Sequence, residues 1–376
     1  MNNPFVYGEA VSGHYFTGRE KECRELRAEL KNGQNIIIFS PRRYGKTSLI
    51  KKVLEGLSKE GVLTFYIDLF FVNSKQKFIE TYAEAVAQEL KGPFAKISQT
   101  LKELIPKIIP KIVIKTGGGT SFEFDFDRTR KISPILEDLY ESVHKLIKHQ
   151  KKKAVVVFDE FQELLSFDDG EIEAGMRSKF QFHRNVSYVF LGSKRNLMQK
   201  LFDDKSRPFY NSGRKYPLKK IEAEEFAKFI KLRFGQTRIK ISDEQVISLL
   251  ELTGRHPYYT QELCHFVWEN AREDKKVTAA TINKSIREIL SSESTNYNNI
   301  WDGITAKQKG FLIALAKNPE ANVYSQEFIL GNQLGTPSTI QRLVKLLYDK
   351  QIIEKENGKV FFEDIFFEKW IISKAT

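Results

Sequence analysis

Short apolar runs alternate with amphipathic segments over residues 1–218. The runs have the length of buried strands, and the segments repeat apolar residues at helical spacing. Strands that alternate with helices along a chain predict an α/β fold, with a parallel sheet covered by helices on both faces. The predicted strands are 35–39, 62–68, 154–158 and 186–191, and the predicted helices between them are 46–57, 73–91 and 135–147.

Residues 92–131 interrupt this alternation. A basic segment with several prolines leads to the apolar run 112–114, and three glycines separate that run from the alternating residues 121–126. Two extended runs on either side of a glycine turn predict a β-hairpin. We therefore interpret residues 92–131 as an insertion into a domain that covers residues 1–218.

The pattern becomes helical after Ile221 and changes again near Trp301. Residues 219–300 predict a small helical lid domain, and residues 301–376 predict three helices and a hairpin, the order of a winged-helix domain. The apolar face expected in the third of these helices is Ile340, Leu343, Leu346 and Leu347. The residues expected to face outward from it are Ser338, Thr339, Gln341, Arg342 and Lys345.

Composition places the chain among ordinary globular proteins. Of its 376 residues, 41% are apolar, and the apolar stretches are far shorter than the roughly 20 residues that span a bilayer. The start of the sequence has no basic and apolar leader. From the short apolar stretches we expect no membrane span. Two cysteines, Cys23 and Cys264, are too few for a disulfide framework, so we expect the protein to reside in a reducing cytoplasm.

The net charge of +12 is concentrated in the middle of the chain. Residues 194–240 hold fourteen basic and five acidic side chains, and residues 91–153 hold fourteen and seven. From Gly303 onward there are ten basic and eight acidic residues. This net positive charge is small for a surface that binds DNA phosphates. The central excess would attract nucleic acid, anionic lipid or an acidic partner; a solvated lysine-rich surface is the alternative.

The segment from Ser40 to Ser48 joins a predicted strand to a predicted helix and has the composition of a phosphate-binding loop. Gly45 lets the backbone approach phosphates, Lys46 supplies a mobile charge, and Thr47 offers a hydroxyl to magnesium. Ser40 stands where the usual pattern has its first glycine, so an ordinary strand-to-helix turn is the alternative. The candidate nucleotide-binding residues of this loop are Ser40, Pro41, Arg42, Arg43, Tyr44, Gly45, Lys46, Thr47 and Ser48.

Two adjacent carboxylates, Asp159 and Glu160, follow the apolar strand 154–158. In a parallel sheet the carboxyl ends of the strands form the edge at which ligands bind. Asp159 is therefore the candidate magnesium ligand together with Thr47, and Glu160 the candidate catalytic residue that orients and polarises a water molecule. Capping of the following helix is the alternative role for both side chains.

Other polar residues are candidates for the same site. Ser193 follows strand 186–191 and would sense a terminal phosphate, although Gly192 and Ser193 also read as a strand-ending turn. Arg207 or Arg214, in a basic loop, would supply a positive charge to the transition state. Gly18 and Arg19 lie in a turn ahead of the phosphate-binding loop and would form a wall for the nucleotide base.

Five motifs carry a family resemblance over nearly the whole chain. They are Phe16 to Glu20, Pro41 to Leu49, Asp159 to Gln162, Gly254 to Pro257, and the ending formed by Thr336 to Arg342 with Phe362 to Phe367. In this combination the chain resembles the archaeal-type ATPases of the STAND class of P-loop NTPases, relatives of the AAA+ and origin-recognition ATPases. The resemblance implies a site for ATP and Mg²⁺, with Gly18 and Arg19 at the base and Pro257 in the lid.

The resemblance also implies an ATP-driven switch that hydrolyses slowly and gates a contact with a protein partner or double-stranded DNA. A DNA-binding regulator in which the nucleotide is a structural ligand is the second hypothesis. A kinase or a GTPase is the third hypothesis. The paired carboxylates favour water as the acceptor, which argues against a kinase, and the sequence lacks the Asn-Lys-x-Asp signature of guanine binding, which argues against a GTPase. The sequence leaves open whether ATP binding drives oligomerisation and whether an arginine enters from a neighbouring subunit.

Overall fold

A computed structural model describes most of the chain. The described residues are 2–9, 11, 13–90, 93–114, 120–125, 131–356 and 358–375. The chain folds as two compact units, one made of Ser12–Lys219 and the other of Met1–Val11 with Lys220–Thr376. The three-domain division at residues 218 and 300 stays a prediction.

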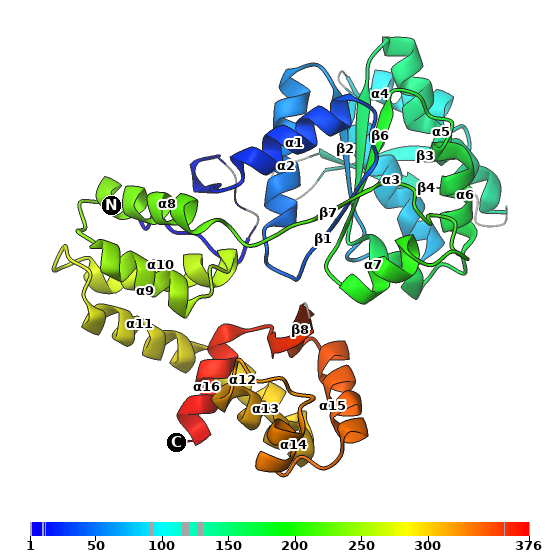
Figure 1. Ribbon diagram of the computed structural model, residues 1–376. Helices are drawn as coiled ribbons and strands as arrows, with labels where there is room; N and C mark the ends of the chain where they lie inside the picture. Colours follow the sequence, from blue (N-terminus) through cyan, green and yellow to red (C-terminus); the bar gives the residue numbers. More distant parts are fainter. Residues whose placement is uncertain are drawn as a thin grey trace. The chain divides into compact units, whose positions relative to one another are not determined.

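A five-stranded sheet is the centre of the first unit, and every neighbouring pair of its strands is parallel (Figure 1). The order is β2-β5-β6-β1-β7, so one strand, β6, separates β1 from β5. Because all strands run in one direction, their carboxyl ends meet at one edge. The strands are β1 (Ile36–Phe39), β2 (Leu63–Asp68), β5 (Ala154–Asp159), β6 (Val186–Gly192) and β7 (Arg214–Pro217).

Helices cover both faces of this sheet, as its apolar strands predicted. Successive residues of a strand point to opposite faces; in β5, Val155 packs in one core and Val156 in the other. The first core includes α1 (Glu20–Lys31) and α2 (Lys46–Lys59). The second includes α3 (Lys75–Glu89), α4 (Phe94–Leu104), α5 (Ser133–Gln150), the 3₁₀ helix η2 (Phe161–Ser166), α6 (Glu171–Phe180) and α7 (Arg195–Phe202).

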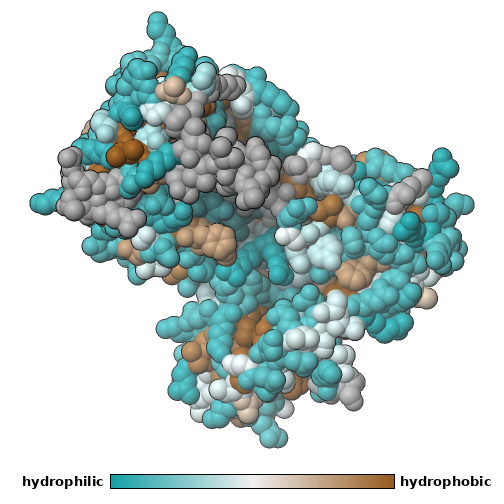
Figure 2. All heavy atoms as spheres, turned by 180° about the vertical axis from the view of Figure 1, so that it is seen from behind, coloured by the Kyte–Doolittle hydropathy of each residue, from teal (hydrophilic) through white to brown (hydrophobic). Residues whose placement is uncertain are grey.

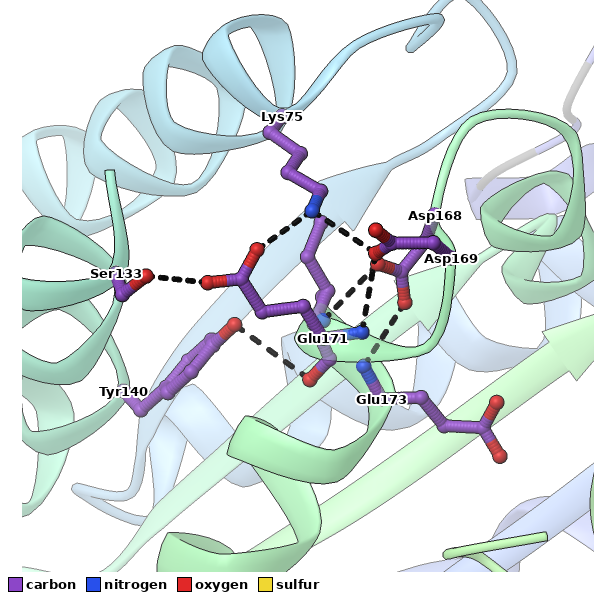
Figure 3. A network of polar contacts seen from close by, with 8 residues as sticks. Lys75, Ser133, Tyr140, Asp168, Asp169, Glu171 and Glu173 are labelled. Carbon is purple, nitrogen blue, oxygen red and sulfur yellow. Dashed lines mark hydrogen bonds and ion pairs between the residues drawn. The ribbon is translucent and has the colours of Figure 1, made fainter. Parts of the chain in front are cut away.

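A polar network joins three of the helices in the second core (Figure 3). Lys75, at the start of α3, pairs with Asp169 and with Glu171 at the start of α6, and Ser133 of α5 donates to Glu171. Asp168 accepts two backbone N–H groups from the first turn of α6. These contacts fix the helix starts relative to one another.

The predicted hairpin within residues 92–131 is confirmed in its strands. β3 (Ile109–Ile114) pairs antiparallel with β4 (Thr120–Asp125). The three glycines of the expected turn lie outside the described residues. A short 3₁₀ helix, η1 (Gly13–Tyr15), precedes α1.

The second unit is built mainly from helices around one apolar core. Phe5, from the start of the chain, packs in this core against Phe229 and Phe234. The first helices of the unit are α8 (Ala223–Gln236), α9 (Asp243–Leu252), α10 (Pro257–Ala271), α11 (Ala279–Ser292) and α12 (Ser294–Asp302). Ser242 and Gln245 form the capping box that the sequence predicted at the start of α9.

The winged helix follows in the predicted order. It comprises α13 (Ala306–Lys317), α14 (Gln326–Gly331), α15 (Pro337–Asp349), the hairpin strands β8 (Ile353–Glu356) and β9 (Lys359–Phe362), and α16 (Ile365–Ala375). The prediction for the apolar face of α15 was wrong at one position. Leu346 is 45% exposed, whereas Val344 is buried, because the buried residues repeat at positions 340, 343, 344 and 347.

No helix among the described residues is both long and apolar enough to cross a bilayer. The face drawn in Figure 2 is mainly hydrophilic, with apolar side chains scattered over it.

Candidate nucleotide site

The loop between β1 and α2 has the backbone that a phosphate-binding loop needs. Gly45 has a φ of +83°, in the left-handed region that glycine adopts most readily, and α2 begins at the next residue. Gly45 is also the N-cap of α2 and has no side chain to cap the helix. An anion such as a phosphate group can therefore take that role at the positive end of the helix dipole.

Lys46 lies within this loop. Its side chain is largely buried, at 6% exposed, and its Nζ donates to the backbone carbonyls of Ser40 and Pro41 at 3.0 Å each. The ammonium group is thus held beside the turn that would surround a phosphate chain. The neighbouring Arg42 and Arg43 are exposed.

Asp159 is directly linked to the phosphate-binding loop. Its Oδ2 accepts hydrogen bonds from the hydroxyls of Thr47, at 2.8 Å, and Tyr66. Asp159 is only 3% exposed, and its Oδ1 accepts the N–H of Glu160 at 2.9 Å. Burial, followed by the nearby Asp159 charge, raises the pKa of Tyr66, so this phenol stays a hydrogen-bond donor.

Glu160 is held by two polar side chains. Its Oε2 accepts from Ser193 Oγ at 2.7 Å and from Gln162 Nε2. Ser193 follows β6, the strand between β1 and β5, so it lies between the two halves of the site. No side chain caps η2, so helix capping does not explain the two carboxylates.

Gly192 allows this arrangement by its small size. A Cβ atom there would lie 2.6 Å from Oε1 of Gln162 and 2.2 Å from the sulfur of Met198. Gln162 itself is buried. Sequence reasoning named Gln162 only as the last residue of the motif that begins at Asp159, and it did not name Tyr66 as a site residue. The only signal for Tyr66 was a tyrosine within an apolar strand.

The predicted base-binding segment also contacts the loop. Arg19 is buried, donates to the backbone carbonyl of Tyr44 at 3.4 Å, and pairs with Glu22 at 2.8 Å. Gly18 has a positive φ of 67° at the turn before it. Contact with a nucleotide base stays a prediction for both residues.

The structure does not bring Arg214 to this site, and we withdraw it as a catalytic residue. Arg214 begins β7 and lies opposite Ile36, the first residue of β1, whereas the phosphate-binding loop follows the end of β1. Its guanidinium pairs with Glu29 of α1. The other candidate, Arg207, pairs with the buried Glu173 at 2.8 Å.

Pro257 lies in the second unit, at the first position of α10. This is a common place for proline, because the missing N–H has no helical partner there. Its predicted part in nucleotide binding stays a prediction.

The polar side chains of Thr47, Asp159, Glu160 and Ser193 thus lie together at the carboxyl edge of the sheet. A model of the ATPase domain found predominantly in Archaea matches residues 16–263, more than half of the chain. The chain belongs to this ATPase family. A model of a probable winged helix domain matches residues 295–373. The expected P-loop ATPase fold with a C-terminal winged helix is thereby confirmed.

A curated protein matches part of the chain. An uncharacterized ATP-binding protein of Methanocaldococcus jannaschii is 31% identical over 153 residues, which are 39% of this chain and 40% of that protein. The match thus spans about two-fifths of the length of this curated relative.

Two solved structures share the fold over nearly the whole chain. A Walker-type ATPase of Pyrococcus abyssi has a TM-score of 0.68 at 16% identity, covering 98% of this chain and 99% of its own. The Aeropyrum pernix ORC1 protein, solved in complex with DNA, has a TM-score of 0.51 at 15% identity, covering 98% and 94%. At these identities the likeness concerns the fold alone.

Proposed function

We propose that this ATPase-family chain binds ATP with Mg²⁺ and hydrolyses it slowly, as a STAND-type switch that couples its nucleotide state to a partner. The observation that carries the proposal is the pairing of Thr47 with Asp159 and of Ser193 with Glu160. These four side chains come from three strand ends and form one continuous polar cluster at the carboxyl edge of the sheet.

The residues fit a magnesium ion bound together with a nucleotide. Mg²⁺ prefers oxygen ligands and is usually held by one or two carboxylates together with substrate phosphates. Thr47 and Asp159 supply a hydroxyl and a carboxylate oxygen 2.8 Å apart. Among the described residues no group of three or more His, Cys, Asp or Glu side chains could hold a metal ion.

Glu160 is the residue we assign to the attacking water. Bound Mg·ATP supplies the phosphoanhydride bond that water cleaves to give ADP and phosphate. The two hydrogen bonds that Glu160 accepts both reach Oε2, and Oε1 makes none with any described residue. Oε1 is therefore the oxygen free to accept a hydrogen bond from water and orient it, while Lys46 would balance phosphate charge.

Replacing Glu160 with Gln tests this assignment. Glu160→Gln should lower the rate of phosphate release at saturating ATP by at least about 100-fold, the lower range for loss of a general base. ATP should still raise the thermal stability of the variant, because the binding loop is intact. Equal turnover in the variant and the parent would contradict the role.

A matched control lies one short turn away. Glu163 lies in η2, which begins directly after Glu160, and pairs with Lys194 at 2.9 Å. Its Oε1 also accepts from Nε2 of Gln162 at 3.2 Å, a contact that the amide oxygen of a glutamine can keep. Glu163→Gln removes the same charge and should keep turnover within about threefold of the parent, because a partly exposed ion pair contributes little. A similar loss in both variants would point to net charge instead of a specific base.

The family resemblance supports the switch. The part that would respond to the nucleotide is the predicted helical lid, residues 219–300, which contains Pro257. Hydrogen exchange of α10 compares the two nucleotide states. Glu160→Gln saturated with ATP should differ from the parent saturated with ADP in the protection of residues 257–271. Identical protection in both states would leave an ATPase without this switch.

The winged helix supports a DNA-binding regulator as the second candidate. Ser338, Gln341, Arg342 and Lys345 are exposed on α15, the third helix of the motif. If this helix enters a DNA groove, Lys345→Glu should weaken duplex binding at least about tenfold and flatten its salt dependence. Lys317→Glu, at an exposed position of α13, is the control and should bind as the parent does.

A further inference from the structure

A pocket lies within the ATPase domain, at the edge of the sheet opposite the candidate nucleotide site. It is a pocket of about 700 Å³ formed by the end of α5 and by the loops that precede β5 and β6. Because β5 has six residues, the pocket lies about 17 Å along the strand from Asp159. Its lining residues are His144, Ile147, Lys148, Lys151, Lys152, Lys153, Phe182, Arg184 and Asn185.

The pocket is strongly cationic. Lys148, Lys151, Lys152 and Arg184 make no ion pair with any residue that the structure describes. Lys153 donates to the backbone carbonyl of Lys31 at 2.8 Å, which leaves its charge without a counterion in that contact. Much of the basic excess of residues 91–153 is thus gathered in one hollow.

The histidine of the pocket adds little charge at neutral pH. Burial, followed by the nearby Lys148 charge, lowers the pKa of His144 below its ordinary value. Its ring stacks on that of His183, with centroids 4.6 Å apart. The positive potential therefore comes from the lysines and the arginine.

The helix dipole accounts for only part of this charge. Cations near a helix C-terminus offset the equivalent of about half a negative charge. Lys148, in the last turn of α5, and Lys151, its C-cap, already supply that. Lys152, Lys153 and Arg184 need another explanation.

Phe182 gives the pocket a second property. Its side chain is 72% exposed, in the loop between α6 and β6, beside Arg184. An exposed aromatic ring next to a cationic hollow is the combination with which proteins bind single-stranded nucleic acid, because bases stack on the ring while cations contact phosphates. A duplex offers no unstacked base to such a ring.

We propose that this pocket binds the backbone of single-stranded nucleic acid, with Phe182 stacking on one base. The pocket shares no residue with the nucleotide site or with α15. Its occupancy does not require ATP turnover, so the two proposals fail independently.

Fluorescence anisotropy with a labelled 20-nucleotide oligo(dT) tests the proposal on the full chain. The neutralising pair Lys151→Gln and Lys152→Gln should lower the slope of log affinity against log salt concentration by about 1.4, since each phosphate contact contributes about 0.7 on a single strand. Phe182→Ala should weaken binding at least about fivefold with an unchanged salt slope.

The chain offers a closely matched control in Lys275→Gln with Lys276→Gln. Both pairs are adjacent exposed lysines, and the first of each has a left-handed backbone, with φ of 52° at Lys151 and 53° at Lys275. The control should keep the parent affinity and slope, and a duplex of the same length should bind more weakly than oligo(dT). The proposal is overturned if the control pair loses as much affinity and salt slope as the pocket pair, or if Phe182→Ala binds oligo(dT) as the parent does. It is also overturned if polyglutamate displaces the labelled oligonucleotide more effectively than unlabelled oligo(dT).

Discussion

The two edges of the five-stranded sheet hold their polar side chains in different ways. At the carboxyl edge, Thr47 bonds Asp159, Ser193 bonds Glu160, and Lys46 bonds two backbone carbonyls. At the amino edge, Lys151 and Lys152 make no ion pair with any described residue. The first edge has fixed geometry, which bond cleavage requires. The second has exposed positive charge without a fixed counterion among the described residues, which suits a long and variable polyanion.

The largest expected effect is the loss of nucleotide binding at the carboxyl edge when Lys46 is replaced. Lys46→Ala should abolish nucleotide binding, because the outer phosphates lose their nearest cation. For the parent, ATP at about 100 times its dissociation constant should add about 2.7 kcal/mol to the free energy of unfolding, and the variant should show no such gain. A thermal-shift titration with Mg·ATP measures both.

The control for Lys46 lies on the same helix. Lys52 is partly exposed on α2 and pairs with Glu55 at 3.2 Å, and Lys52→Ala should keep the full stabilisation by ATP. Oligo(dT) binding should survive in both variants, because the pocket lies at the other edge. If Lys46→Ala is stabilised by ATP as strongly as the parent, the loop does not bind the triphosphate as proposed.

An intermediate effect is expected at Ser193. Ser193→Ala removes one hydrogen bond to the Glu160 carboxylate, worth about 1.5 kcal/mol for a charged acceptor, or roughly a tenfold lower kcat. The affinity for ATP should not change, since Ser193 acts through Glu160 as a positioning residue. Steady-state kinetics give this split between kcat and KM.

Threonine provides the conservative comparison at this position. Ser193→Thr keeps the hydroxyl and should recover most of the lost turnover. If the alanine variant weakens ATP binding and leaves kcat unchanged, Ser193 contacts the nucleotide instead, as a sensor of the terminal phosphate.

The smallest expected effect is at Tyr66. Tyr66→Phe removes one of the two hydroxyl donors to Asp159, whereas Thr47 and the Glu160 N–H remain. We expect the Mg²⁺ concentration for half-maximal turnover to rise only about threefold, less than the full value of a hydrogen bond to a charged acceptor, because the two remaining donors keep the Asp159 carboxylate in place. A change above about thirtyfold would show that Tyr66 is essential for the position of Asp159.

Much of the fold and of the site followed from local sequence. The apolar runs of β1 and β5 each end in the residues of the site, and parallel strands must bring those ends to one edge. This is why Lys46, Thr47, Asp159 and Glu160 were recognisable without coordinates. Ser193 followed from the same rule, because it succeeds a third apolar strand.

The rest depended on tertiary contacts that local patterns do not encode. β7 is a short and largely exposed edge strand, so its sequence had no apolar run to show that Arg214 stands at its beginning. Tyr66 and Gln162 acquire their roles from partners on other strands and turns. Leu346 and Val344 lie about half a helical turn apart on α15. Four apolar residues lie close together in this part of the sequence, and the pattern did not show which of them face the core.

The central claim is that Thr47 and Asp159, from distant parts of the sequence, act on one metal ion bound with ATP. A double-mutant cycle of Thr47→Ala and Asp159→Asn, read out as Mn²⁺ affinity of the ATP complex by electron paramagnetic resonance, tests it most directly. We predict that the two losses do not add, with an interaction energy above about 0.5 kcal/mol. Losses that add to within about 0.3 kcal/mol would show that the two residues act independently and would contradict the account.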